Sequence, residues 1–185
     1  MVERFFPTKL SNGDVNRRRD NLTLLSGPVS SGKTSLLFQL ALNVASASTD
    51  SRVVFICHRK KIESNPPFLS QGIDPSSDVF NRIQMKNSVT SSRARDMAMV
   101  RTLALCHNAI VDAKKAFCEL VLSETNHGDS PRSLFIYKRW ITKIFTIKGH
   151  GHGDGSFLLT SNGESEKSAK YSIALQYLIL EQMIV

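Results

Sequence analysis

The stretch GPVSSGKTS, residues 27–35, decides how this sequence folds. The preceding NLTLLS has the composition of a short strand over residues 21–26, and LLFQLALNVA continues with apolar side chains at helical spacing over residues 35–47. A glycine-rich turn between a strand and a helix aims several backbone amides at one point, where they can bind an anion. The sequence therefore predicts a phosphate-binding loop.

The stretch matches the pattern G-x-x-x-x-G-K-[ST], and each fixed position has a chemical reason. Gly27 and Gly32 leave room for phosphate oxygens, Lys33 brings a positive charge to the β- and γ-phosphates, and the Thr34 hydroxyl is placed to bind Mg²⁺. An ordinary glycine turn is the alternative. The strand-loop-helix context favours a nucleotide, so we expect ATP and Mg²⁺ to bind at Gly27, Pro28, Val29, Ser30, Ser31, Gly32, Lys33, Thr34 and Ser35.

Length and composition favour one folded domain. The chain has 185 residues, of which 41% are hydrophobic, and a formal net charge of +8, which points to polyanions such as nucleic acid. Residues 1–20 end in a basic run and are predicted to form a polar arm, with the domain over residues 21–185. No secretory signal or membrane-spanning apolar stretch is visible, so we expect a soluble intracellular protein.

The other elements follow from apolar patterns. VVFICH, residues 53–58, is typical of a strand buried on both faces, as in a parallel sheet; residues 82–86 predict an edge strand, 93–116 a long helix and 119–123 another buried strand. The C-terminal part is interpreted as short strands joined by turns: LFIYKRW, KIFTIKG, SFLLT and YSIALQYLIL. The cysteines, flanked by apolar residues, are expected to be buried free thiols: Cys57, Cys106 and Cys118.

With the phosphate loop, VVFICHR, RDMAMVRTLALCHNA and LVLSETNHG in this order, the chain resembles the RecA-like recombinase paralogues. Within them it looks most like the ATPase subunits that accompany SWIM-domain proteins in Shu-type complexes. The resemblance covers about residues 22–180 and rests chiefly on the phosphate loop. It implies a three-layer α/β P-loop fold and a nuclear factor of homologous recombination. Such a factor binds ATP, single-stranded DNA, recombinase paralogues and a SWIM zinc-finger partner, and it is not membrane-bound.

Two departures from the family pattern weaken the expectation of hydrolysis. The family places a glutamate at the end of the second core strand, where this chain has Arg59, and a cation cannot act as that base. The apolar strand that ends in the magnesium-binding aspartate is also missing, because only NSVTSS separates RIQMK from the long helix. Asp112 is the nearest apolar-then-acid pattern, but it falls on that helix. We therefore expect an incomplete central sheet, and its origin is either a shortened, alternatively spliced isoform or an error in the predicted gene structure.

Further polar residues have both a functional and a structural interpretation. The family senses the γ-phosphate with a polar triplet, and Asn126 and His127 lie at the matching position or simply cap a loop. The segment IYKRW predicts single-stranded DNA binding through Arg132, Lys138, Arg139 and Trp140, with a partly buried strand as the alternative. His150 and His152 are expected in a turn rather than in a metal site.

Three functions remain open at this point. The first is an ATP-binding, DNA-associated accessory factor of recombination in which hydrolysis is weak or absent. The second is a P-loop small-molecule kinase, which needs an acid or an arginine lid near the phosphates. The third is a catalytically inert scaffold that stabilises a zinc-finger partner.

Overall fold

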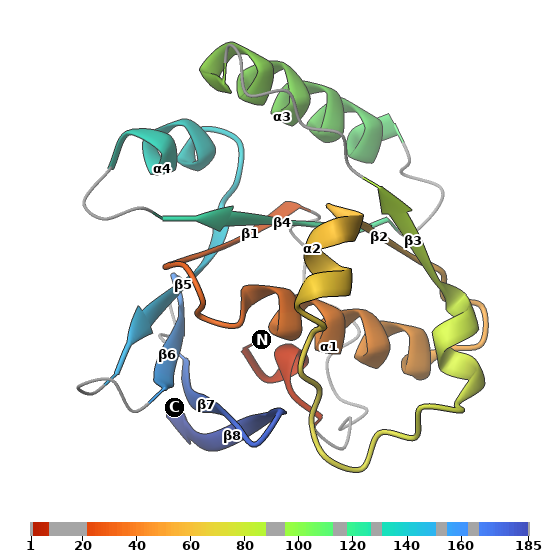
Figure 1. Cartoon of the computed structure of the whole chain (residues 1–185). Coiled ribbons are helices and arrows are strands. Elements are labelled where there is room, and N and C mark those ends of the chain that lie inside the picture. The colour runs from red at the N-terminus through yellow and green to blue at the C-terminus, as the bar shows by residue number, and fades with distance from the viewer. Residues whose placement is uncertain are drawn as a thin grey trace.

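The computed structural model describes residues 2–7, 22–87, 95–112, 118–126, 131–150, 155–162 and 167–184. Figure 1 shows the order of the elements. These are η1 (Val2–Phe5), β1 (Leu22–Gly27), α1 (Lys33–Ala47), β2 (Val53–Cys57), α2 (Arg59–Ser64), η2 (Asp78–Arg82), β3 (Ile83–Asn87), α3 (Arg95–Asp112), β4 (Leu120–Thr125), α4 (Pro131–Lys138), β5 (Lys143–Gly149), β6 (Ser156–Ser161), β7 (Ser168–Ala174) and β8 (Tyr177–Ile184). In the described part of the chain, no helix is long and apolar enough to cross a membrane.

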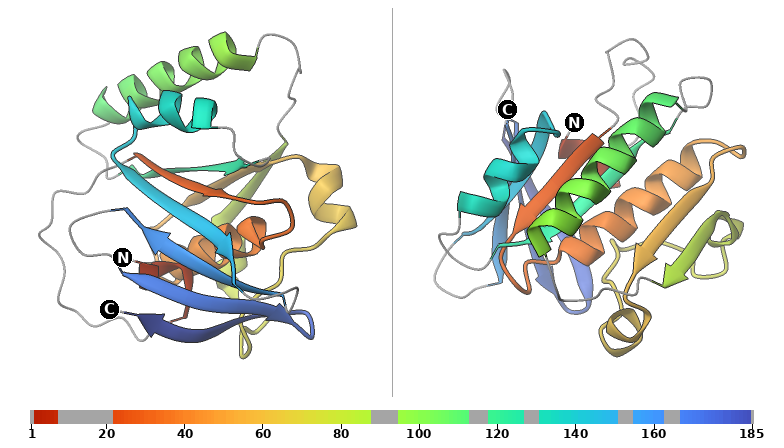
Figure 2. Two further views of the ribbon diagram at one scale, coloured as in Figure 1. Left: turned by 90° about the vertical axis from the view of Figure 1, so that its left-hand side faces the viewer. Right: turned by 90° about the horizontal axis from the view of Figure 1, so that it is seen from above.

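The main sheet has six strands in the order β4-β1-β5-β6-β7-β8. Strand β1 is parallel to both β4 and β5, whereas β5 to β8 form an antiparallel run. Figure 2 shows how this run continues the sheet away from β1. The predicted strands over residues 21–26, KIFTIKG and SFLLT are confirmed. Residues 119–123 also belong to a strand, β4, but it lies at the edge of the sheet and is half-buried rather than buried. The segment YSIALQYLIL is not one strand, because a turn at residues 175–176 divides it between β7 and β8.

Both faces of β1 are buried, by different helices. Leu25 belongs to a core with Leu36 of α1, whereas Leu24 belongs to a second core with Leu103 of α3. Alternate residues of a strand point to opposite faces, so α1 and the pair α3 and α4 cover opposite sides of the sheet, as Figure 1 shows. This arrangement confirms the predicted three-layer α/β fold and the long helix.

Strands β2 and β3 form a separate parallel pair. Val53 and Phe55 pack against α1, but Val54 and Ile56 are 55% and 64% exposed, so the prediction that β2 is buried on both faces is wrong. The cause is the divided sheet: the parallel strands are split into β4-β1-β5 and β2-β3, and α3 and α4 pack on the first group. The expected incompleteness of the parallel sheet is thereby confirmed, as is the edge strand β3.

The first residues of the chain belong to the core, which corrects the expectation of a polar arm for residues 2–7. Val2, Phe5 and Phe6 are buried, and the Phe5 ring meets the Phe145 ring at 5.1 Å between centroids. Arg4 also donates two hydrogen bonds to Glu119, at 2.7 and 2.6 Å. Residues 8–20 of the predicted arm lie outside the described residues.

Two further predictions are corrected. The segment LFIYKRW is not a strand, because residues 131–138 form α4 and Trp140 follows it. Pro131 at the first helical position is compatible with a helix start, and Ile136 and Tyr137 pack against the core with Leu103. The cysteines are free but not all buried, since Cys118 is exposed and Cys57 and Cys106 are half-buried.

Candidate nucleotide-binding site

The predicted phosphate loop connects β1 to α1 with the conformation that its sequence requires. Ser30 and Gly32 both have positive φ angles, of 60° and 73°, and α1 begins directly afterwards at Lys33. The amide of Leu36 donates to the Gly32 carbonyl at 2.9 Å, so helical hydrogen bonding starts within the motif. At the other end, the Asn126 amide donates to the Gly27 carbonyl at 2.9 Å and ties β4 to the loop.

The Lys33 ammonium is held by the loop itself. Its Nζ donates to the Gly27 carbonyl at 2.9 Å, to the Pro28 carbonyl, and to the Ser31 hydroxyl at 3.4 Å. Lys33 is buried, and this burial, reinforced by the positive charge of Lys61, lowers its pKa from 10.5 to about 8. A desolvated cation beside the first turn of a 15-residue helix fits a phosphate, which would supply the missing negative charge.

Ser35 has a structural role that the motif does not reveal. Its hydroxyl accepts a hydrogen bond from the Phe68 amide at 2.9 Å, and one turn later the side-chain Oε1 of Gln39 accepts from the Ser70 amide at 3.1 Å. Both contacts fasten the segment that follows α2 to α1. Figure 1 shows α2 above α1 as a result, which explains why the charge of Lys61 reaches Lys33. The run RKK after β2 is the sequence signal that could have identified Lys61.

The acid chemistry that hydrolysis needs is sparse in the described part of the chain. Arg59 begins α2 two residues after the end of β2, and its Nε donates to Glu63 at 2.7 Å, where both side chains are exposed. Asp112 ends α3 and is exposed. No group of three His, Cys, Asp or Glu residues within the described ranges could hold a metal ion. Thr34, the predicted magnesium ligand, lies half-buried in the first turn of α1, next to the loop.

One acid at the same edge of the sheet was not identified from the sequence. Glu124 is the register partner of Ser26, one residue before the loop begins. Its charge acts on α4: burial and then the charge of Glu124 raise the pKa of Tyr137 to about 12. An acid after the apolar run LVL was the available signal, but the strand order that places it beside β1 is a long-range feature.

The remaining predicted site residues lie apart from the loop. Asn126 joins the loop through its backbone and its side chain is exposed, whereas His127 lies outside the described residues. His150 is exposed after β5, and His152 is also outside them. The expected turn at these histidines is therefore described only in part.

The predicted DNA-binding residues lie on or just after α4. Lys138 and Arg139 are exposed, Trp140 is half-buried beside the His107 ring at 5.9 Å, and for Arg132 only the helical backbone is described. A cavity of about 360 Å³ adjoins them, lined by Val100, Phe135, Ile136, Arg139 and Trp140. Phe135 is 76% exposed, so an aromatic face and cations are both accessible here.

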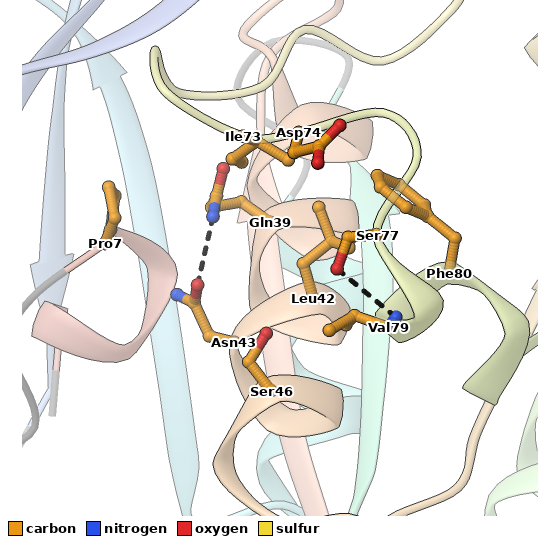
Figure 3. A pocket seen from close by; sticks show the side chains of 10 residues that line it. All are labelled: Pro7, Gln39, Leu42, Asn43, Ser46, Ile73, Asp74, Ser77, Val79 and Phe80. Atoms are coloured by element: carbon orange, nitrogen blue, oxygen red, sulfur yellow. Dashed lines mark hydrogen bonds between the residues drawn. The ribbon is translucent and has the colours of Figure 1, made fainter.

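A second cavity, of about 220 Å³, lies between α1 and the residues that precede and form η2, and it includes no residue of the phosphate loop. Figure 3 shows two of its polar side chains turned toward each other, where Gln39 donates to Asn43 at 3.0 Å, and the Ser77 hydroxyl turned toward the Val79 amide. Asn43 in turn donates to the backbone carbonyls of Arg4 and Phe6. Because these groups already have protein partners, this cavity is a packing feature between α1, η1 and η2 rather than the phosphate site.

Neither a protein-family model nor a curated protein sequence matches the chain. Solved structures do. The crystal structure of the RadB recombinase is similar with a TM-score of 0.56 and 14% identity, covering 86% of this chain and 90% of that one. The flagellar accessory protein FlaH from Methanocaldococcus jannaschii is similar with a TM-score of 0.56 and 15% identity, covering 88% of this chain and 90% of that one. A KaiC-like protein from Pyrococcus horikoshii OT3 is similar with a TM-score of 0.54 and 13% identity, covering 88% of this chain and 90% of that one. This chain therefore has a RecA-like fold.

Proposed function

We propose that this chain is an ATP-binding RecA-like protein that accompanies DNA recombination and hydrolyses ATP weakly or not at all. The observation that carries the proposal is the buried Lys33 ammonium, held by the loop at the N-terminus of α1. A phosphate anion there gains both the amides of the helix start and a cation that has already lost its water. Magnesium bound with the nucleotide would supply further charge neutralisation, with Thr34 as its protein ligand.

Weak hydrolysis follows from the residues around the loop. A water molecule that attacks a phosphate needs an oriented base, and the start of α2, where the family has its glutamate, holds Arg59, which is paired with Glu63. Lys61 of the same helix adds a second positive charge near Lys33. Positive charges, with no acid at the position after β2 that would orient the water, favour binding of a triphosphate over its cleavage. ATP would then act as a ligand that controls assembly.

The nucleotide proposal is tested by titration calorimetry with Mg-ATP on the wild type, Lys33→Ala and Lys138→Ala. We expect Lys33→Ala to weaken binding by about a hundredfold, since the buried charge meets the phosphates directly. Lys138→Ala removes an equal charge from exposed α4 and should leave the affinity unchanged. Equal and negligible heats for all three proteins would refute ATP binding.

The DNA part of the proposal rests on α4 and the residues that follow it. Phe135 and Trp140 offer aromatic faces and Arg139 an exposed cation at one cavity. Lys138, the last residue of α4, is a second exposed cation. Stacking on aromatic rings combined with phosphate contacts is how proteins bind single strands without sequence preference. The similarity to the RadB recombinase and the net charge of +8 support the same conclusion.

Fluorescence anisotropy with a labelled oligothymidine tests this surface. We expect binding to weaken steeply with salt, and the Lys138→Ala and Arg139→Ala variants each to lower the slope of log affinity against log salt by about 0.7. Phe135→Ala should weaken binding roughly tenfold at all salt concentrations. Lys33→Ala serves as the matched control. Affinity that does not change with salt would contradict a DNA surface.

The resemblance to Shu-type subunits extends the proposal to a nuclear protein that associates with a SWIM zinc-finger protein and with recombinase paralogues. Co-purification with a SWIM-domain protein, with and without Mg-ATP, tests the partner. We expect Lys33→Ala to weaken the nucleotide-dependent part of this association. Partner binding that is insensitive to Lys33→Ala would instead identify an inert scaffold.

A further inference from the structure

A buried hydroxyl from the C-terminal half of the chain contacts the phosphate loop. Tyr171 of β7 donates a hydrogen bond from its Oη to the backbone carbonyl of Ser31 at 2.6 Å, across 140 positions of sequence. Both residues are fully buried. Burial raises the pKa of Tyr171, so the hydroxyl keeps its proton and remains a donor at physiological pH.

A second residue of β7 limits the space at the next loop position. A Cβ added to Gly32 would lie 2.3 Å from the Ile173 Cδ1, so the Ile173 side chain would have to move to accept any other residue there. Gly32 also has a φ angle of 73°, which favours glycine. Tyr171 and Ile173 therefore contact the two residues that immediately precede Lys33.

The core determines where the Tyr171 hydroxyl lies. Its ring stacks on Phe157 of β6 at 5.5 Å between centroids and meets Phe6 at 5.9 Å. Strand β7 is in turn paired with β8, where Ile173 faces Leu178. A shift of β7 would thus move the Ser31 carbonyl and, with it, the start of α1, where Lys33 and the first free amides are placed.

We propose that Tyr171 and Ile173 are positioning residues of the nucleotide loop, and that they couple nucleotide binding to the order of the β7-β8 pair. This inference rests on the proposed binding of ATP, and it adds that the order of β7-β8 regulates that binding. Coupling between two sites is reciprocal, so a bound nucleotide must stabilise β7-β8 by the same factor by which ordered β7-β8 strengthens binding.

The test compares Mg-ATP affinity in Tyr171→Phe, Ile173→Val and the control Tyr177→Phe, whose tyrosine is 40% exposed on β8. Tyr171→Phe keeps the stacked ring and removes only the donor, so we expect binding about tenfold weaker, as for one lost hydrogen bond. Ile173→Val removes only the Cδ1 methyl and should weaken binding about threefold. Tyr177→Phe should bind like the wild type.

Hydrogen exchange separates coupling from a general loss of stability. In the wild type we expect Mg-ATP to slow exchange of the Ile173 and Leu178 amides, whose acceptors are the Gly155 and Leu69 carbonyls. In Tyr171→Phe this nucleotide-dependent slowing should be lost. A merely structural tyrosine would lower the melting temperature without changing the affinity of the folded protein.

The outcomes distinguish failure of the positioning role from failure of ATP binding. Wild-type affinity and unchanged exchange protection in Tyr171→Phe would overturn the positioning role and leave ATP binding standing. Absence of binding by the wild type would overturn both. If Tyr171→Phe does not fold, Ile173→Val is decisive, and an unchanged affinity in that variant would overturn the positioning role.

Discussion

Strands β1 and β2 are alike in sequence and different in the structure. Each is a short apolar run, LTLLSG or VVFIC, that leads into a helix. Every residue of β1 is buried, because β4 and β5 flank it and helices cover both of its faces. In β2 burial alternates, and Val54 and Ile56 are exposed. The neighbours of a strand, more than its own hydrophobicity, decide how deeply it is buried.

The same difference separates the chemistry at the ends of the two strands. After β1 the chain forms a loop in which a buried ammonium is surrounded by carbonyls and a helix start. After β2 it forms α2, whose Arg59, Lys60 and Lys61 are exposed. Buried groups have fixed positions and perturbed pKa values, so the region of β1 is suited to bind a ligand tightly. The exposed cations after β2 can add only long-range attraction.

The largest expected effect comes from truncating the buried Leu25 of β1 and comparing it with the exposed Ile56 of β2. Leu25→Ala in β1 should lower the free energy of unfolding by about 2–5 kcal/mol, since it opens a cavity between the sheet and α1. Ile56→Ala in β2 should cost about 1 kcal/mol or less, because its side chain already meets solvent. Urea unfolding of both variants gives the comparison. Equal losses would mean that the outer face of β2 is covered in solution.

A smaller effect is expected in the pH dependence of stability. The pKa of Lys33 is about 8 in the folded chain and 10.5 as the ordinary value, so the unfolded chain binds more protons between these values. The free energy of unfolding should therefore rise from about pH 8 to 10.5, relative to a Lys33→Met variant that lacks this group. Subtracting the two pH profiles removes the other titrating groups. Parallel profiles would contradict a desolvated ammonium.

The smallest expected effects come from the ion pairs of the two regions. Arg4 and Glu119 form a bidentate pair, with Arg4 half exposed, between η1 and the start of β4; Arg4→Met should cost about 1 kcal/mol. Arg59 and Glu63 are both exposed on α2, and Arg59→Met should cause no measurable change. Thermal unfolding at low and high salt checks both. If only Arg59→Met lowered the melting temperature, and did so in a salt-dependent way, the comparison would be reversed.

The sequence predicted the features that depend on local pattern. The loop at residues 27–35, the helix after it and most strands follow from spacing and from residues with a fixed backbone role, such as Gly32. The helical residues Ile136 and Tyr137 were assigned to a strand because a short apolar run has no clear period, although Pro131 marks a helix start. Local pattern alone was insufficient there.

The features that the sequence did not predict depend on contacts between distant segments. Val2 and Phe5 are buried only because α1 and the C-terminal strands lie around them. The exposure of Ile56 results from the division of the sheet, and the bond from Tyr171 to the loop spans most of the chain. In the site, the motif alone identified Lys33. The effect of the Lys61 charge on Lys33 could be seen only once the position of α2 in the fold was known.

The central claim is that the loop after β1 binds a triphosphate, and thermal unfolding with and without Mg-ATP tests it most directly. A ligand that binds only the folded chain raises the melting temperature. Saturating Mg-ATP should raise the melting temperature of the wild type by several degrees and leave the melting temperature of Lys33→Ala unchanged. A wild-type protein that melts at the same temperature with and without Mg-ATP would contradict the account.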